Sequence, residues 1–271
     1  MIPVEFSYAR PDSVDGALAL LAEHGEDAKI MAGGHSLLPV MKLRLATPEM
    51  IIDIGRLTEI DYIRLDGDEV AIGAGTRHRT VASSTLLAKE SPLLPAVART
   101  VGDPQVRHRG TLGGSLAHAD PASDLPAAVL ALGGTIVLRG RNGTRSVPIT
   151  EFYTGVFSTV MEPDELIVEI RVPRTGTAGF AYEKFVRRAN DWAIVAVAVV
   201  DGRVGLVNMG GTPLRASATE AALADGASIP EAAALADQGT EPSSDLTATA
   251  DYRRHLARVL TRRALTTAAG G

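Results

Sequence analysis

The chain has 271 residues, a formal net charge of −5, and 45% hydrophobic residues. This length suits one large domain or two smaller ones, and the acidic balance without a basic run excludes a typical nucleic-acid partner. Cysteine is absent, which excludes disulfides, thiolate metal sites and an iron–sulfur cluster held by this chain itself. No HExxH motif accompanies the six histidines, so no metal site is expected.

The first sixty residues predict a small β-α-β-α-β lobe. Apolar residues recur at helical spacing from Val14 until Gly25, behind an Asp12-Ser13 cap. A short strand over 28–31 then enters a glycine loop, and a second strand follows over 50–54. Residues 1–10 lack the charged and apolar regions of a signal peptide, so we expect a soluble, cytoplasmic protein.

The middle of the chain mixes strands and helices. Alternation about Asp66-Gly67-Asp68 predicts a hairpin of strands 62–65 and 70–73. Further elements are expected as helices over 80–89, 92–101 and 127–132 and strands over 135–138 and 166–172, with a loop region between those two strands. Pro173, Gly176 and Gly179 mark a linker.

The last hundred residues have a different pattern. Strands are predicted over 180–186, 193–200 and 203–209, the last two joined by an Asp201-Gly202 turn. Helices are predicted over 216–224, 230–236 and 251–266, with a polar linker over 238–245. The apolar run over 192–200 is far shorter than the roughly 20 residues that span a bilayer. This pattern indicates a separate C-terminal α+β domain.

Two glycine loops carry the main functional signal. Ala32-Gly33-Gly34-His35-Ser36 and Thr111-Leu112-Gly113-Gly114-Ser115 each place paired glycines before a hydroxyl residue and helix-compatible sequence. Such loops let backbone N–H groups approach an anion closely. Because a diphosphate needs donors from several directions, two loops favour a dinucleotide. The P-loop is absent, and residues 73–78 depart from the Rossmann fingerprint because His78 replaces its third glycine.

Several side chains have both a functional and an ordinary interpretation. Asp124 could accept a ribose hydroxyl or cap a helix. His35 could donate to a phosphate or lie on a surface loop, and Lys184 could face an anion or water. Trp192, the only tryptophan, could stack on a flat cofactor or lie partly buried in the core. Several arginines could bind an anion or contact another subunit, although charged residues on a helix usually face water. They are Arg187, Arg188, Arg253, Arg254, Arg258, Arg262 and Arg263.

With these motifs in place, the chain resembles the FAD-binding medium subunits of the molybdenum hydroxylases over nearly its whole length. The resemblance rests on the two glycine loops, on Pro121-Ala122-Ser123-Asp124-Leu125-Pro126, on Tyr182-Glu183-Lys184 and on the closing helix from Tyr252 to Leu265. It implies an α+β fold: a two-lobed, PCMH-type FAD-binding domain over 1–176, with lobes of about 1–57 and 58–176, and a C-terminal flavoprotein domain over 177–271 with an antiparallel sheet and helices.

The resemblance also implies site residues. It places the FAD diphosphate against both loops, which comprise Ala32, Gly33, Gly34, His35, Ser36 and Leu37 in the first and Thr111, Gly113, Gly114 and Ser115 in the second. Asp124 falls on the ribose side, Leu166 and Lys184 near the flavin ring, and Trp192 is a further candidate for the ring. No catalytic base or nucleophile in this chain is implied.

The implied function is electron transfer from iron–sulfur clusters through FAD to an external acceptor. Many relatives have Asn after the second glycine pair, whereas this chain has Ser115. That serine, with Asp191-Trp192-Ala193, resembles the aerobic carbon monoxide dehydrogenases most. Medium subunits of aldehyde or N-heterocycle hydroxylases remain alternatives, as do a stand-alone FAD-dependent NAD(P)H reductase and a cofactor-free adaptor.

The resemblance further implies partner subunits. A large subunit would carry the molybdopterin cofactor and a small one two 2Fe–2S clusters, in a dimer of heterotrimers. No nucleic acid and no transmembrane segment are expected. The holoenzyme would be cytoplasmic and peripheral at the inner face of the membrane through its acceptor.

Overall fold

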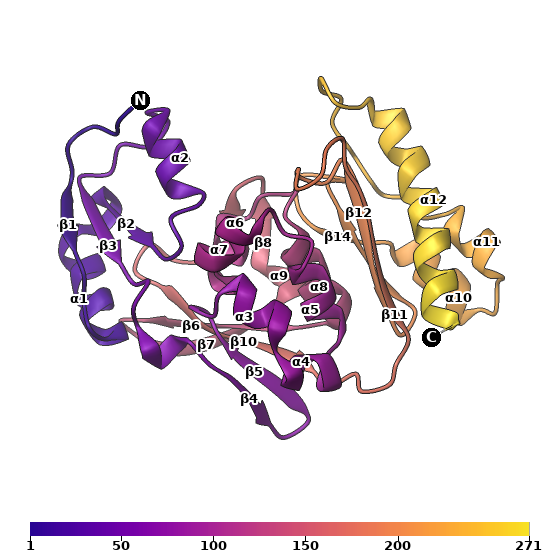
Figure 1. The fold of residues 1–271 in the computed structure, drawn as a ribbon, viewed down its shortest axis with the longest axis horizontal. Coiled ribbons are helices and arrows are strands. Elements are labelled where there is room, and N and C mark those ends of the chain that lie inside the picture. The colour runs from indigo at the N-terminus through magenta and orange to yellow at the C-terminus, as the bar shows by residue number, and fades with distance from the viewer. Residues whose placement is uncertain (271) are drawn as a thin grey trace.

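The computed structural model describes residues 1–270. Three regions follow one another along the longest axis of the molecule (Figure 1). An N-terminal lobe with a small parallel sheet comes first, a central region with an antiparallel sheet and many helices second, and a C-terminal sheet with an outer helix third.

The N-terminal lobe contains a parallel sheet in the order β1-β3-β2. Its elements are β1 (Ser7–Ala9), α1 (Val14–His24), η1 (Gly25–Asp27), β2 (Ala28–Met31), α2 (Leu37–Lys42) and β3 (Met50–Asp53). Helix α1 begins as the sequence predicts, because the Ser13 hydroxyl accepts a 3.0 Å hydrogen bond from the Gly16 amide. The lobe therefore has the predicted β-α-β-α-β order.

The central region contains an antiparallel sheet in the order β4-β5-β10-β6-β7. The strands are β4 (Ile63–Asp66), β5 (Glu69–Gly73), β6 (Thr135–Gly140), β7 (Gly143–Pro148) and β10 (Leu166–Pro173), with η2 (Thr58–Ile60) ahead of them and a small hairpin of β8 (Tyr153–Gly155) and β9 (Ser158–Thr159). Its helices are α3 (His78–Ser83), α4 (Thr85–Glu90), α5 (Leu93–Ala98), α6 (Pro104–Arg109), α7 (Leu112–His118), α8 (Asp124–Leu132) and α9 (Ile149–Phe152).

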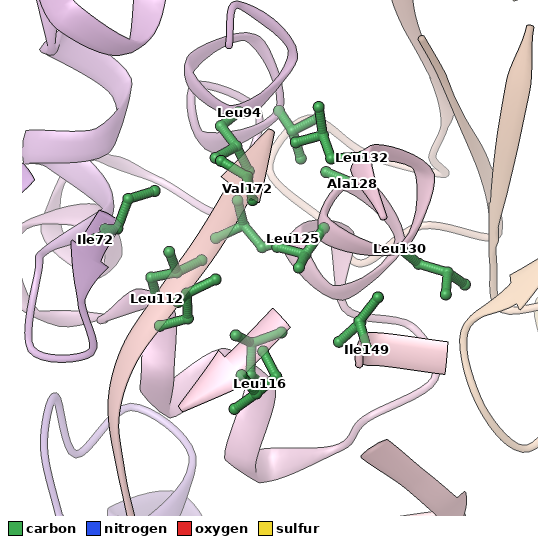
Figure 2. Close-up of a cluster of buried hydrophobic side chains, with 14 of the residues drawn as sticks. Ile72, Leu94, Leu112, Leu116, Leu125, Ala128, Leu130, Leu132, Ile149 and Val172 are labelled. Carbon is green, nitrogen blue, oxygen red and sulfur yellow. The ribbon is translucent and has the colours of Figure 1, made fainter. Parts of the chain in front are cut away.

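Helix α8 lies at the centre of the molecule, and every one of its residues is buried. On one side it packs into the main core, where Leu125 and Ala128 lie near Leu116 and Val172 (Figure 2). On the other side it packs against the C-terminal sheet, where a Cβ on Gly205 would approach the Ala127 carbonyl oxygen to 2.3 Å. A helix buried all round must be apolar all round, as this one is after Asp124.

The C-terminal region contains an antiparallel sheet in the order β11-β12-β13-β14. Its elements are β11 (Phe180–Phe185), β12 (Val195–Val200), β13 (Arg203–Val207), β14 (Leu214–Arg215), α10 (Ser217–Ala224), α11 (Ile229–Ala233) and α12 (Ala250–Ala269). Helix α12 packs against β11 and β12 on the face away from α8 (Figure 1). The predicted meander and closing helix are therefore present.

Three parts of the central region differ from the prediction. The single helix over 80–89 is two helices, because extended Ser84 ends α3 and caps α4 through a 3.2 Å bond from the Leu87 amide. The region between β6 and β10 is not a loop but holds β7, α9 and the β8–β9 hairpin. Helix α6 was not predicted, because it has no fully buried residue and hence no apolar stripe.

Two kinds of feature are absent from residues 1–270. No helix there is both long and apolar enough to cross a bilayer. The same residues contain no group of three His, Cys, Asp or Glu side chains arranged to hold a metal ion.

Candidate functional site

A cavity of about 590 Å³ opens where the three regions meet. It is lined by every residue that the sequence analysis placed at the cofactor: Ala32–Leu37, Thr111, Gly113, Gly114, Ser115, Asp124, Leu166, Lys184 and Trp192. Residues more than 150 positions apart in the chain thus share one cavity. Their role in binding a cofactor stays a prediction.

The first glycine loop offers unengaged backbone donors to this cavity. Within residues 1–270, the amides from Gly33 to Leu37 donate to no protein acceptor, and the first engaged amide is that of Leu38, which bonds to the Gly34 carbonyl at 3.1 Å. Gly34 has a φ of +74°, a conformation that L side chains rarely adopt. Successive N–H groups on such a turn form a concave site suited to an anion.

Gly33 brings the two loops together. A Cβ at this position would lie 2.4 Å from the carbonyl oxygen of Arg109 and 2.9 Å from Cα of Gly110. Both neighbours are backbone atoms, which cannot rotate away as a flexible side chain could. Glycine is therefore required for the N-terminal lobe to touch the segment that leads into the second loop.

Arg77 connects the same two parts of the chain. Its guanidinium donates to the carbonyl oxygens of Gly55, which follows β3, and Arg109, which ends α6. Burial, followed by the charge of Arg109, lowers the pKa of Arg77. This side chain therefore fixes the lobe against the central region.

The second glycine pair is not in a loop as predicted, because Gly113 and Gly114 lie in the first turn of α7, behind its N-cap Thr111. The name second glycine loop is kept for residues 111–115, whose amides are used within the protein. Leu112 donates to the Thr76 carbonyl at 3.0 Å, and Gly113 donates to that of Ala74 at 2.9 Å. The Gly114 amide donates to the Thr111 hydroxyl at 3.1 Å, and the Ser115 amide to the Thr111 carbonyl at 3.1 Å. This loop consequently offers the cavity a close backbone surface and the Ser115 hydroxyl, but not those amides.

Asp124 is held by two side chains from β11. Lys184 donates to one carboxylate oxygen at 2.8 Å and also to the Thr100 carbonyl at 3.1 Å, while the Tyr182 hydroxyl donates to the other oxygen. Burial raises the pKa of Asp124, although Lys184 opposes this shift. The Lys184 side chain is only 10% exposed, so it does not lie on a solvated strand face. Asp124 is the first residue of α8, and Ser123 is the N-cap.

His78 is a site residue that the sequence analysis missed. It is buried and lines the cavity, and its Nε2 lies 3.2 Å from the Ser115 hydroxyl. Burial, assisted by nearby basic side chains, lowers the pKa of His78 to about 4. His78 and Ser115 are 37 positions apart, so only the fold pairs them.

His35 and Trp192 both lie at exposed parts of the cavity wall. His35 is exposed, and its Nδ1 is 3.1 Å from the Gly33 carbonyl oxygen. Trp192 is 59% exposed and belongs to the loop before β12 rather than to that strand. The interpretation of Trp192 as a core residue is therefore wrong.

Two protein families match consecutive parts of the chain. The family described as the FAD binding domain in molybdopterin dehydrogenase matches residues 4–175, and the CO dehydrogenase flavoprotein C-terminal domain matches residues 180–268. The chain belongs to this family. It is thus an FAD-binding oxidoreductase subunit of the molybdenum hydroxylase type.

Individual relatives align over nearly the whole chain. The carbon monoxide dehydrogenase medium chain of Hydrogenophaga pseudoflava is 44% identical over 99% of this chain and 98% of its own length. The 6-hydroxypseudooxynicotine dehydrogenase complex subunit alpha of Paenarthrobacter nicotinovorans is 37% identical over 98% of this chain and 95% of its own. A solved carbon monoxide dehydrogenase from Hydrogenophaga pseudoflava superposes with a TM-score of 0.96 at 45% identity, covering 100% of this chain and 99% of that one.

Proposed function

We propose that this chain holds FAD in the cavity between its three regions and transfers electrons within a carbon monoxide dehydrogenase. The family supports the cofactor, and the 44% identity to a carbon monoxide dehydrogenase medium chain supports the substrate of the holoenzyme. The observation that carries the proposal is the run of unengaged amides from Gly33 to Leu37 beside the close glycine contact to Arg109. That arrangement suits a diphosphate.

The residues of the cavity fit the different parts of FAD. Amides of the first loop would bind diphosphate oxygens, and the Ser115 hydroxyl would add a donor from the opposite side. Asp124 still has lone pairs for a ribose hydroxyl beyond those that accept from Lys184 and Tyr182. Leu166, which is buried at the start of β10, gives an apolar wall suited to a ring.

The protein residues orient the cofactor, keep water from part of it and set its electrostatic surroundings. Bound FAD would supply the redox chemistry, which accepts electrons from an iron–sulfur centre and passes them to an acceptor. The Lys184–Asp124 pair keeps an ammonium group at the cavity wall, where it favours negative charge on a ring. Trp192 lines the cavity and is largely exposed, and it would lie against the ring.

Partner subunits follow from the same proposal. Because this chain has no cysteine, 2Fe–2S clusters would reside in a small subunit, and the molybdopterin cofactor in a large one. We propose a dimer of such heterotrimers, located in the cytoplasm and passing electrons to an external acceptor at the inner face of the membrane. Residues 1–176, with lobes of about 1–57 and 58–176, would form the FAD-binding domain and 177–271 the C-terminal domain.

Purification of the chain with its native partners tests the proposal. The expected result is released FAD near equivalence with this chain, molybdenum and iron in the complex, and reduction of the FAD by CO. If an aldehyde or an N-heterocycle reduces the FAD and CO does not, the substrate is that compound and not CO. NADH oxidation by the isolated chain would favour a stand-alone reductase, and a complex without FAD would overturn the proposal.

A further inference from the structure

The loop that carries Trp192 connects β11 to β12 and is closed at its base. We define the Trp192 loop as residues 186–193. The Ile194 amide donates to the Phe185 carbonyl at 2.9 Å, so the two ends of the loop lie side by side. Between them, residues 187–190 are exposed, and Asn190 has a φ of +69°. The position of the residues between these two ends therefore depends on how the ends are held.

The C-terminal end of the Trp192 loop is anchored by side chains from two other elements. The Asn208 side-chain amide donates to the carbonyl oxygens of Ala193 at 2.9 Å and Ile194 at 3.2 Å. The guanidinium of Arg253, on α12, also donates to the Ile194 carbonyl. The two residues that directly follow Trp192 are thus held through their main-chain oxygens.

Arg253 is unlike the other arginines of its helix. It is 1% exposed, whereas its neighbour Arg254 has a side chain that is 36% exposed. Its remaining donors are engaged by the Ser243 carbonyl at 3.1 Å, Asp245 at 2.6 Å and Thr247 at 3.3 Å. A buried guanidinium is tolerated only when it is paired and hydrogen-bonded, and its planar fork fixes the direction of each bond.

Asn208 also connects this anchor to the segment that leads into α8. Its backbone amide donates to the Pro121 carbonyl at 2.9 Å, three residues before Asp124. Its φ of +60° is uncommon for a residue other than glycine. Asparagine adopts this conformation more readily than other L residues, and three hydrogen bonds fix Asn208 in it.

We propose that Arg253 and Asn208 are positioning residues for Trp192. By fixing the carbonyls of Ala193 and Ile194, they determine where the indole stands in the cavity wall and how it lies against the ring bound there. The identity of that ring as the flavin of FAD rests on the proposed function. Access of an electron acceptor to the ring would then depend on α12, although α12 does not line the cavity.

Trp192 is the only tryptophan, so its fluorescence in the full chain reports this position directly. We would compare wild type, Arg253→Met, which keeps an unbranched apolar stem but removes the donors, and Arg254→Met as the matched control on the same helix. FAD content after denaturation, loss of Trp192 emission on adding FAD, and quenching by acrylamide would be measured for each. In wild type and Arg254→Met, we expect bound FAD to quench the emission.

In Arg253→Met, the account predicts FAD content equal to wild type, but weaker quenching by FAD and stronger quenching by acrylamide. If that variant does not fold, Asn208→Gly takes its place, because glycine suits a φ of +60° and lacks the side-chain donors. Wild-type quenching in the variant would overturn the inference.

The same measurements separate this inference from the proposed function. Unquenched emission in wild type with FAD bound would overturn the inference alone. Absence of bound FAD would overturn the proposed function, and the acrylamide comparison in the FAD-free chain would still decide whether Arg253 positions Trp192.

Discussion

The two glycine loops share a sequence pattern but differ in whether their backbone amides are hydrogen-bonded within the protein. In the first loop, the amides from Gly33 to Leu37 have no protein acceptor within residues 1–270. In the second, the amides from Leu112 to Ser115 all donate to protein oxygens. A paired glycine therefore indicates close backbone approach, but the approaching group can be a ligand or the protein itself.

The surroundings of the loops differ in the same way. The first loop contains exposed His35 and leads into the short helix α2. The second is enclosed by His78 and leads to the paired Asp124. We conclude that the second side of the cavity is a rigid wall and that the first side supplies the free donors.

The largest expected effect is the loss of stability when Lys184, the partner of buried Asp124, is replaced. Lys184→Met leaves Asp124 buried without its cation, which costs about 3–5 kcal/mol of unfolding free energy at neutral pH. Burial already raises the pKa of Asp124, and loss of Lys184 raises it further. Because the folded state then binds the proton more tightly than the unfolded state, the variant regains stability as pH falls through that pKa. Urea unfolding across pH measures this.

A double variant provides the control. Lys184→Met with Asp124→Asn removes the buried charge together with its partner, so most of the lost stability should return. Equal instability of the single and double variants at every pH would show that the ion pair is not what holds this wall.

The next largest effect is the loss of stability that His78 causes as the pH falls. Its pKa of about 4 lies below the usual 6.5, so as pH falls below 6.5 the unfolded state takes up a proton that the folded state resists. Stability present above pH 6.5 is therefore lost towards pH 4, by up to about 3 kcal/mol. His78→Gln should flatten this part of the pH profile, and an unchanged profile would contradict the burial of a neutral imidazole.

A pair of glycine variants compares the loops themselves. A Cβ at Gly113 would lie 2.6 Å from Cβ of Ala74 and 2.8 Å from its carbonyl oxygen, so Gly113→Ala should lower stability by about 1–3 kcal/mol. Gly33→Ala should instead abolish FAD binding, because it separates the first loop from Arg109. Calorimetry and FAD titration measure both.

Gly155→Ala is the matched control, since its Cβ would meet only a side-chain atom at 4.0 Å. It should leave both stability and FAD affinity unchanged. If Gly113→Ala and Gly33→Ala are both fully folded and weaken FAD binding equally, the proposed difference between the two loops is wrong.

The smallest effect is expected at Ser115. Nδ1 of His78 is buried without a partner within residues 1–270, so we assign the ring proton to Nε2, which then donates to the Ser115 oxygen. The Ser115 hydroxyl proton is thereby free to face the cavity. Ser115→Ala should weaken FAD affinity by about 1 kcal/mol, a fivefold rise in Kd. It should also lower stability by about 1 kcal/mol, because the buried Nε2–H of His78 loses its acceptor. Ser115→Thr, which keeps the hydroxyl, is the control, and an unchanged Kd in Ser115→Ala would contradict this role.

Much of the fold can be predicted from the sequence because residues close to the ends of many helices and strands specify where those elements begin and end. The cap at Ser13, the stop at Gly25 and the turn at Asp201-Gly202 all specify element ends without distant help. Strand β7 escapes prediction because only one of its residues is buried, which leaves no alternation of apolar residues.

The candidate site is predictable only in part. The glycine loops and Asp124 have recognisable spacing, but the use of amides within the second loop depends on contacts with Ala74 and Thr76. The pairing of His78 with Ser115 and the burial of Arg253 likewise come from distant segments. Charge alone suggested that Arg253 faces water, which is wrong, because a fully hydrogen-bonded arginine can be buried.

Amide hydrogen exchange with and without FAD tests the central claim most directly. The account predicts that FAD slows exchange strongly from Gly33 to Leu37, while the amides from Leu112 to Ser115 are already slow and change little. The opposite pattern, with protection gained at the second loop and none at the first, would contradict the account.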